Sequence, residues 1–93
     1  MTLKTKGEGM TVVTFKTKTE VFEFLNECKE FGIRATLTPI PKEIKIGCGL
    51  SVSISLLDAA KSYSLIVRGY FPTFNGIFTI KRVGAKTTLI KKY

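Results

Sequence analysis

The chain has 93 residues, of which 44% are hydrophobic and 24% are charged, and 15 Lys and Arg against 7 Asp and Glu give it a formal net charge of +8. This length predicts one domain, which buries roughly 60–65% of the surface of the unfolded chain. The composition argues against a membrane protein, because no apolar run reaches the roughly 18 residues that a transmembrane helix needs. The chain has no histidine and only two cysteines, so neither a metal site nor a cofactor is expected.

Much of the positive charge lies at the two ends. Residues 1–9 carry a net charge of +1 and residues 84–93 carry +3, which leaves +4 for the residues between them. We therefore expect a single domain over residues 10–83, with a basic N-terminal extension and a basic C-terminal extension or edge strand. The first nine residues lack an apolar segment of signal-peptide length, and two cysteines do not suggest a disulfide scaffold, so the expected location is the cytoplasm.

The first predicted elements are a strand and a helix. Residues 11–16 are β-branched or aromatic, which is typical of a strand. Thr17 and Glu20 have the spacing of a capping box, so a helix should begin there, run to about Phe31 and end at Gly32. The predicted apolar face of this helix consists of Val21, Phe24, Leu25, Cys28 and Phe31.

A long loop separates the next two predicted strands. Residues 34–38 alternate as a second strand, and residues 50–54 form a third strand in which Val52 and Ile54 face the core. The loop between them, residues 39–49, is rich in glycine, proline and lysine.

A second helix should follow the third strand. Residues 55–58 can cap it, and Gly69 or Pro72 should end it. Its approximate inner face is predicted to be Leu57, Ala60, Ser64, Val67 and Phe71.

A fourth strand is predicted over residues 77–83, after the turn residues Asn75 and Gly76. In this strand the positions expected to face the core are Phe78 and Ile80, and those expected to face outward are Thr79 and Lys81. The resulting order, β-α-β-β-α-β, predicts an α+β ferredoxin-like sandwich, with two helices on one face of a four-stranded antiparallel sheet. Residues 87–90 can return as an extra edge strand beside the fourth.

The loop before the third strand contains the candidate functional residue, Cys48. Gly47 and Gly49 leave its thiol uncovered and can present backbone N–H groups to it, while Lys42 and Lys45 favour the reactive thiolate. A glycine-rich turn whose cysteine fills a small gap is the alternative interpretation, because free cysteines are often buried.

The predicted strand order supports a functional Cys48. The first and third strands are central neighbours, so Cys48 should lie near Lys16, Thr17 and Lys18 at the start of the first helix, and the partial positive charge there should lower the thiol pKa. Cys28 lies about ten residues into that helix, roughly 15 Å away at 1.5 Å per residue, which makes a disulfide between the two cysteines improbable. Cys28 is most simply a core residue.

Three segments resemble a family of small bacterial proteins named as selenium/sulfur carriers. They are Val12-Val13-Thr14-Phe15-Lys16, with its spacing to Gly32-Ile33; the run Pro39-x-Pro-Lys-Glu-Ile-x-x-Gly-Cys-Gly-Leu; and Asn75-Gly76-Ile77-Phe78. The resemblance covers roughly residues 10–80. It implies a carrier thiol at Cys48 that holds sulfur or selenium as a persulfide or its selenium analogue. It favours a carrier or binding protein over a stand-alone enzyme.

The carrier interpretation implies protein partners: a donor such as a cysteine desulfurase, and an acceptor. Two alternatives remain open, a non-catalytic interaction module and a nucleic-acid-binding domain, for which basic charge favours only non-specific binding. RNA-binding sheets of this topology stack bases on exposed aromatic side chains. No aromatic is predicted on the outward face, whose positions are Thr14, Lys16, Thr36, Thr38, Ser51, Ser53, Thr79 and Lys81.

Overall fold

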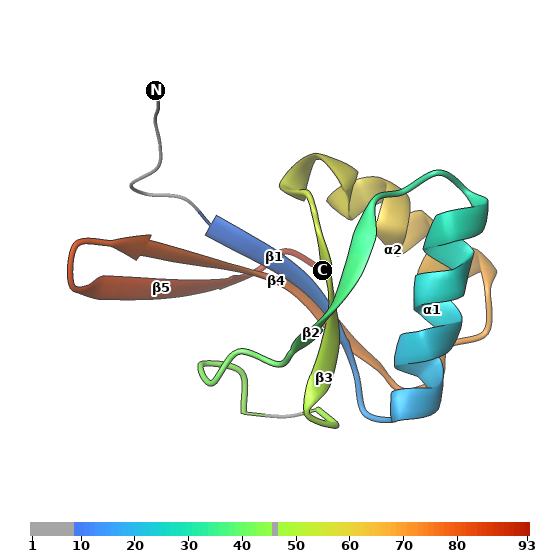
Figure 1. Cartoon of the computed structure of the whole chain (residues 1–93), viewed down its shortest axis with the longest axis horizontal. Helices are drawn as coiled ribbons and strands as arrows, with labels where there is room; N and C mark the ends of the chain where they lie inside the picture. Colours follow the sequence, from blue (N-terminus) through green and yellow to red (C-terminus); the bar gives the residue numbers. More distant parts are fainter. Residues whose placement is uncertain (1–8, 46) are drawn as a thin grey trace.

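The computed structural model describes residues 9–45 and 47–93, and its fold is α+β (Figure 1). The elements are β1 (Gly9–Phe15), α1 (Lys18–Glu30), β2 (Ala35–Pro39), β3 (Leu50–Ile54), the 3-10 turn η1 (Leu56–Asp58), α2 (Ala59–Arg68), β4 (Phe74–Val83) and β5 (Lys86–Lys91). Of the expected N-terminal extension, residues 1–9, the structure describes only Gly9, which begins β1.

The strands form one antiparallel sheet in the order β2-β3-β1-β4-β5. Both helices lie on one face of this sheet (Figure 1). As predicted, β1 and β3 are neighbours in the interior of the sheet, with Thr14 opposite Ser51. The extra edge strand is confirmed as β5, which pairs with β4 from Phe78 opposite Lys91 to Val83 opposite Lys86. The sheet therefore has five strands, where the minimum expectation was four.

The main core lies between the sheet and the helices, and aromatic rings occupy its centre. Phe15, at the end of β1, is fully buried. Its ring centroid lies 5.5 Å from that of Phe24, 5.5 Å from that of Phe71 and 5.9 Å from that of Phe74. Tilted and edge-on contacts at these distances are favourable beyond the burial of apolar area.

The ends of α1 follow the sequence signals, with one difference. Thr17 is the N-cap and its Oγ1 accepts a hydrogen bond from the Glu20 N–H at 3.4 Å, while Gly32 has a positive φ of 75° just beyond the helix. The Glu20 carboxylate does not complete a capping box. It accepts the backbone N–H of Thr73 at 3.0 and 3.3 Å, and so joins α1 to the segment that leads into β4.

The predicted inner face of α2 is wrong. The buried residues are Ala59, Ser62, Leu65 and Ile66, whereas Leu57 is 93% exposed and Val67 is 63% exposed. The 3-10 turn that precedes Ala59 winds more tightly than an α-helix. A helical period counted through this turn therefore assigns the residues of α2 to the wrong face of the helix. Residues 65–67 are also all apolar, and the sequence does not show which of them point inward.

The predicted orientation of β4 is wrong as well. Ile77 faces the helices opposite Val13, and the alternation places Phe78 and Ile80 on the other face. Thr79 is buried on the helix side, where its Oγ1 lies 3.0 Å from Oγ1 of Thr11. Because Ile77, Phe78 and Ile80 are all apolar, the period of two does not fix which face is inward. The second face of the sheet therefore carries an aromatic residue, contrary to expectation.

Candidate functional site

The connection between β2 and β3 folds back across the second face of the sheet. Its base is closed by a hydrogen bond from the Ile40 N–H to the Gly49 carbonyl at 2.9 Å. Near the tip, the Ile44 N–H donates to the Pro41 carbonyl at 3.0 Å. Ile46, within the same loop, lies outside the described residues. These bonds give the described parts of the loop a defined path.

Apolar packing holds this loop on the sheet. Ile44 is only 5% exposed and packs with Val12 and Ile80, and partly buried Ile40 and Phe78 join this second cluster. Fully burying an aliphatic side chain of this size contributes about 1.5–3 kcal/mol. The second face is therefore partly covered by the loop, and Phe78 is not a freely exposed platform for a base.

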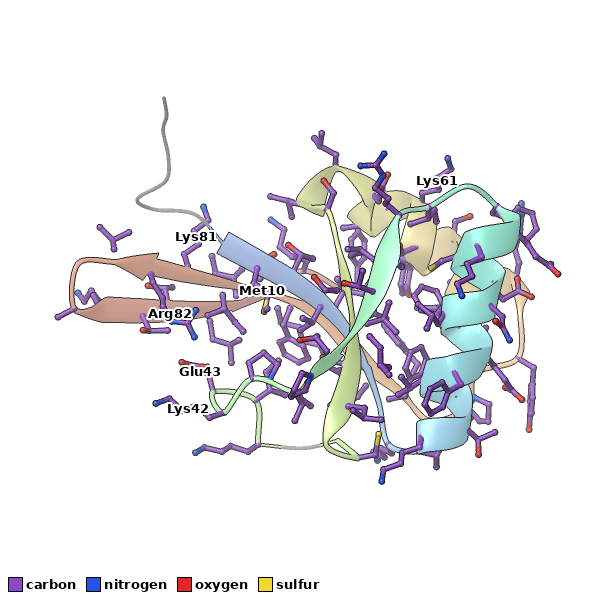
Figure 2. All side chains as sticks on the ribbon, viewed as in Figure 1. Met10, Lys42, Glu43, Lys61, Lys81 and Arg82 are labelled. Carbon is purple, nitrogen blue, oxygen red and sulfur yellow. The ribbon has the colours of Figure 1, made fainter. Side chains whose placement is uncertain are left out.

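An ion pair connects the loop to the far end of β4. The Arg82 guanidinium lies 3.5 Å from the Glu43 carboxylate, and Figure 2 shows the two side chains pointing toward one another. Lys42 lies beside Glu43 at the loop tip, next to the β4–β5 hairpin, and it is exposed. The sequence analysis expected Lys42 to favour the thiolate of Cys48, together with Lys45 and the lysines at the start of α1, and this role of Lys42 stays a prediction.

The two glycines beside Cys48 both adopt backbone angles that favour glycine. Gly47 has φ 138° and Gly49 has φ 92°. A Cβ at Gly47 would lie 2.5 Å from Cδ1 of Ile40, whereas a Cβ at Gly49 would meet nothing within 4 Å. The two glycines are therefore a conformational requirement of the loop, and at Gly47 a side chain would also displace the terminal methyl group of Ile40.

Cys48 lies at the rim of the main core. Its side chain is half-buried and packs against the apolar cluster on the helix side of the sheet. Its Sγ donates a weak hydrogen bond to the Leu50 carbonyl at 3.7 Å. The sequence had suggested backbone N–H donors toward this sulfur, but the hydrogen bond that Sγ makes within the described residues is to an acceptor.

The structure brings the Gly-Cys-Gly segment next to the end of β1. The position that a Cβ of Gly47 would take lies 3.7 Å from the Phe15 carbonyl oxygen. From Phe15 the chain continues through exposed Lys16, Thr17 and Lys18 into α1. The Thr17 hydroxyl already contacts the Glu20 N–H and, at 3.4 Å, the Thr73 hydroxyl.

Several predicted supporting roles stay predictions. Lys45 and Lys18 are exposed, and within the part of the chain that the structure describes neither side chain forms a hydrogen bond with the Cys48 thiol. Sequence reasoning also missed the residues that fix the loop, namely Ile40, Ile44 and the pair of Glu43 with Arg82. The apolar residues Ile40 and Ile44, in a loop rich in glycine, proline and lysine, were the available signal, but nothing local identified the surface on which they pack.

Cys28 is a core residue, as predicted. It is 0% exposed, and both cysteines are free. Burial raises the pKa of its thiol to about 12, and the negative charges of Asp58 and Glu27 add to the shift. Its thiol is therefore protonated at neutral pH, which leaves Cys48 as the candidate for thiol chemistry.

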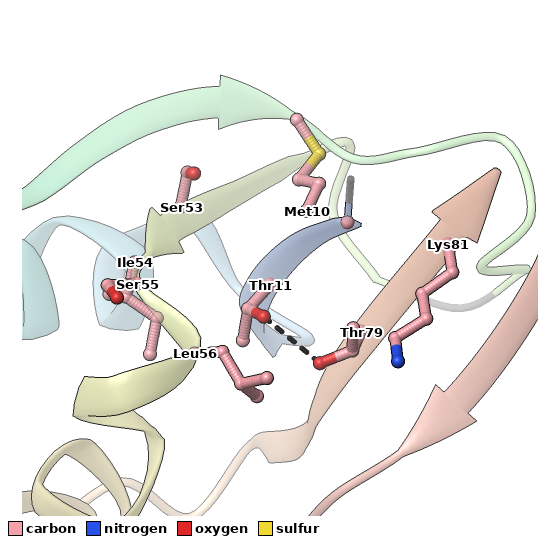
Figure 3. A pocket seen from close by; sticks show the side chains of 9 residues that line it. Met10, Thr11, Ser53, Ile54, Ser55, Leu56, Thr79 and Lys81 are labelled. Atoms are coloured by element: carbon pink, nitrogen blue, oxygen red, sulfur yellow. Dashed lines mark hydrogen bonds between the residues drawn. The ribbon is translucent and has the colours of Figure 1, made fainter. Parts of the chain in front are cut away.

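A separate hollow of about 590 Å³ lies at the opposite end of the sheet (Figure 3). It is lined partly by Met10, Ile54, Leu56 and Lys81, and the hydrogen-bonded pair of Thr11 and Thr79 is in its wall. These residues lie at the start of β1, at the end of β3, in η1 and in β4, whereas Cys48 precedes the start of β3. The hollow is therefore not part of the Cys48 site.

Comparison with known families assigns the chain to one of them. Residues 10–73 match the family described as "Putative Se/S carrier protein-like". Since the match covers more than half of the chain, the protein belongs to this family. No curated protein and no solved structure matches the chain. In residues 9–45 and 47–93, no helix is long and apolar enough to cross a bilayer.

The two glycines provide a test of the loop geometry. We expect Gly47→Ala to lower the free energy of unfolding by about 2–4 kcal/mol, because both backbone strain and the contact with Ile40 oppose it. Gly49→Ala should cost only about 1–2 kcal/mol, because only the positive φ opposes it. Urea unfolding of both variants checks the difference. Equal losses would mean that Gly47 is not packed against Ile40.

Proposed function

We propose that this protein is a sulfur or selenium carrier and that Cys48 is the thiol that holds the transferred atom. The observation that carries the proposal is the contrast between the two cysteines within a chain of the carrier family. Cys28 is fully enclosed, whereas Cys48 lies half-buried in a loop between two glycines. Family membership supports the class of function, and the loop supports the choice of residue.

The proposed step is a thiol–persulfide exchange. The Cys48 thiol loses its proton, and its thiolate attacks the terminal sulfur of a donor persulfide. A sulfur–sulfur bond forms on Cys48 while the sulfur–sulfur bond of the donor breaks, and the donor leaves as a thiolate that can take up a proton. A thiolate cannot donate to the Leu50 carbonyl, so the sulfur must give up this contact before it reacts. Attack by an acceptor thiolate on the bound sulfur would return Cys48 to its starting state.

The backbone at Gly47 and Gly49 supports this role sterically. Neither residue carries a side chain that would cover the sulfur, so a donor cysteine on a protein partner can approach it. Exposed Lys16, Lys18 and Lys45 lie on the adjoining segments of the chain. We assign them the docking of an acidic partner surface, and Gly47 and Gly49 the presentation of backbone N–H groups to the charged sulfur.

The test is transfer from a cysteine desulfurase supplied with cysteine. The protein should gain about 32 Da, the mass of one sulfur atom, and peptide mapping should place it on Cys48. Cys48→Ser should gain nothing, and Cys28→Ala should behave as the wild type does. Rapid alkylation of Cys48 in a parallel sample establishes that the thiol is accessible.

The outcomes separate the alternatives. Alkylation without sulfur transfer from any desulfurase tested would leave an accessible thiol and remove the carrier function. An interaction module or a nucleic-acid-binding domain would keep its binding in Cys48→Ser. Modification of Cys28 in preference to Cys48 would contradict the assignment of the site.

A further inference from the structure

The strand β5 forms an exposed edge of the sheet. All six of its residues are exposed, and among the strands of residues 9–45 and 47–93 its only neighbour is β4. Figure 1 shows the β4–β5 hairpin at the side of the molecule away from the helices. Such an edge has unpaired backbone groups that can bind another strand. The opposite edge, β2, is shorter and ends at Pro39, which has no N–H to donate.

The register shows which backbone groups of β5 face outward. The Lys92 N–H donates to the Ile77 carbonyl at 2.7 Å, so the backbone groups of Lys92 point toward β4. Because these groups alternate along a strand, those of residues 86, 88 and 90 also point toward β4. The N–H and C=O groups of Thr87, Leu89 and Lys91 therefore point to the free edge.

The hairpin carries charge of one sign. Residues 74–93 contain Lys81, Arg82, Lys86, Lys91 and Lys92 and no acidic residue. Arg82 is partly neutralised by Glu43, but no acidic residue is available within the hairpin for the four lysines. An extended segment with acidic side chains would meet complementary charge along the whole edge.

Charge and geometry together select the partner. Two copies of this chain that paired through β5 would bring two all-positive strands together, which disfavours a second copy. Nucleic acid fits the charge, but it cannot use a row of backbone groups spaced two residues apart. A peptide strand uses both.

We propose that the edge of β5 is a docking site for an extended acidic segment of a partner protein, which adds to the sheet beside β5 as a further strand. Backbone hydrogen bonds at Thr87, Leu89 and Lys91 supply the affinity, and the lysines select acidic sequences. The family match ends at residue 73, before β4 begins, so this surface lies outside the matched segment.

The probe is a seven-residue capped peptide in which Glu and Val alternate, added to the full chain labelled with nitrogen-15. Binding should slow hydrogen exchange at the amides of Thr87, Leu89 and Lys91. The amides of Thr88 and Ile90, which already face β4, should change little. A peptide with Lys in place of Glu should not bind.

Two substitutions at one position separate backbone pairing from side-chain contact. Leu89→Pro removes an outward N–H without removing a bond to β4, and should weaken peptide binding at least about tenfold. Leu89→Ala keeps the N–H and should change binding less than about threefold. Circular dichroism confirms that both variants fold.

Three results would overturn the proposal. Equal binding by Leu89→Pro and the wild type would mean that backbone pairing is absent. Equal loss in Leu89→Pro and Leu89→Ala would indicate a contact with the leucine side chain. A single-stranded oligonucleotide of equal charge that bound more tightly than the peptide, with no effect of Leu89→Pro, would assign the hairpin to nucleic acid.

Discussion

Above about pH 9, the wild-type protein should lose stability faster than its Cys28→Ala variant, because the pKa of Cys28 lies at about 12 in the folded protein against 9.0 for an ordinary thiol. Below pH 9 the thiol is protonated in both states, so its contribution is fully present. Between the two values the unfolded chain releases the proton while the folded protein keeps it, and unfolding becomes more favourable. This pKa difference of about three units lowers the free energy of unfolding by up to about 4 kcal/mol at high pH.

Urea unfolding at pH 8, 9.5 and 11 measures this effect. Cys28→Ala should be the less stable protein at pH 8, because it leaves a small cavity, and the gap should shrink or reverse at pH 11. Lysine and tyrosine titrate in the same range, but they do so in both proteins and cancel in the comparison. Cys48→Ala is the matched control, since this thiol is only half-buried. A gap that stays constant with pH would mean that Cys28 is not held in an apolar environment.

The same burial makes the transfer experiment easier to interpret. A thiol that is protonated and enclosed at neutral pH does not compete for a donor persulfide or for an alkylating reagent. Any modification of the folded protein should therefore be found on Cys48. Modification of Cys28 would report unfolding, and its rate should follow the stability of the protein.

Local signals predicted the positions of the elements well. Thr17 and Gly32 set the ends of α1, and Gly69 caps the end of α2, because helix capping depends on a few neighbouring atoms. The third strand was predicted with its observed bounds, since serine and apolar residues alternate in it without interruption. Where the pattern was unambiguous, the predicted inward residues, Val52 and Ile54, are in the core.

The errors lie where apolar residues follow one another. In β4 and in the last turns of α2, neighbouring apolar positions satisfy more than one periodic pattern, and only the packed structure decides between them. Val67 and Phe78 were misplaced for this reason, whereas Leu57 was misplaced because it lies in the 3-10 turn before α2. The capping interpretation of Glu20 failed for a different reason, because its carboxylate binds Thr73, which is 53 residues away.

The candidate site was predicted in part. The sequence indicated Cys48 and its two glycines, and the strand order put them beside the end of β1. It could not predict that Ile44 packs under the loop or that Glu43 pairs with Arg82, since both contacts join distant segments. The half-buried position of the thiol, with the Leu50 carbonyl as its partner, also required the structure.

Phe15→Ala should be the most damaging single truncation beside the site. Phe15 is fully buried and contacts the rings of Phe24, Phe71 and Phe74, so its removal leaves a cavity at the centre of the core. Truncating a buried aromatic side chain in this way lowers the free energy of unfolding by about 3–5 kcal/mol, which is a large part of the stability of a small domain. Chemical unfolding followed by circular dichroism measures the loss.

Phe22→Ala is the matched control, because Phe22 lies on α1 but is 46% exposed. This substitution should lower the free energy of unfolding by less than about 1 kcal/mol.

The accessibility of the Cys48 thiol should change together with the stability. Gly47 lies against the Phe15 carbonyl, so a β1 that is poorly anchored at this end should loosen the loop and expose the Cys48 sulfur. Alkylation of Cys48 should therefore speed up in Phe15→Ala and stay unchanged in Phe22→Ala, under conditions in which both variants remain folded. An unchanged rate in Phe15→Ala would show that the loop is held by Ile44 and the Glu43–Arg82 pair alone.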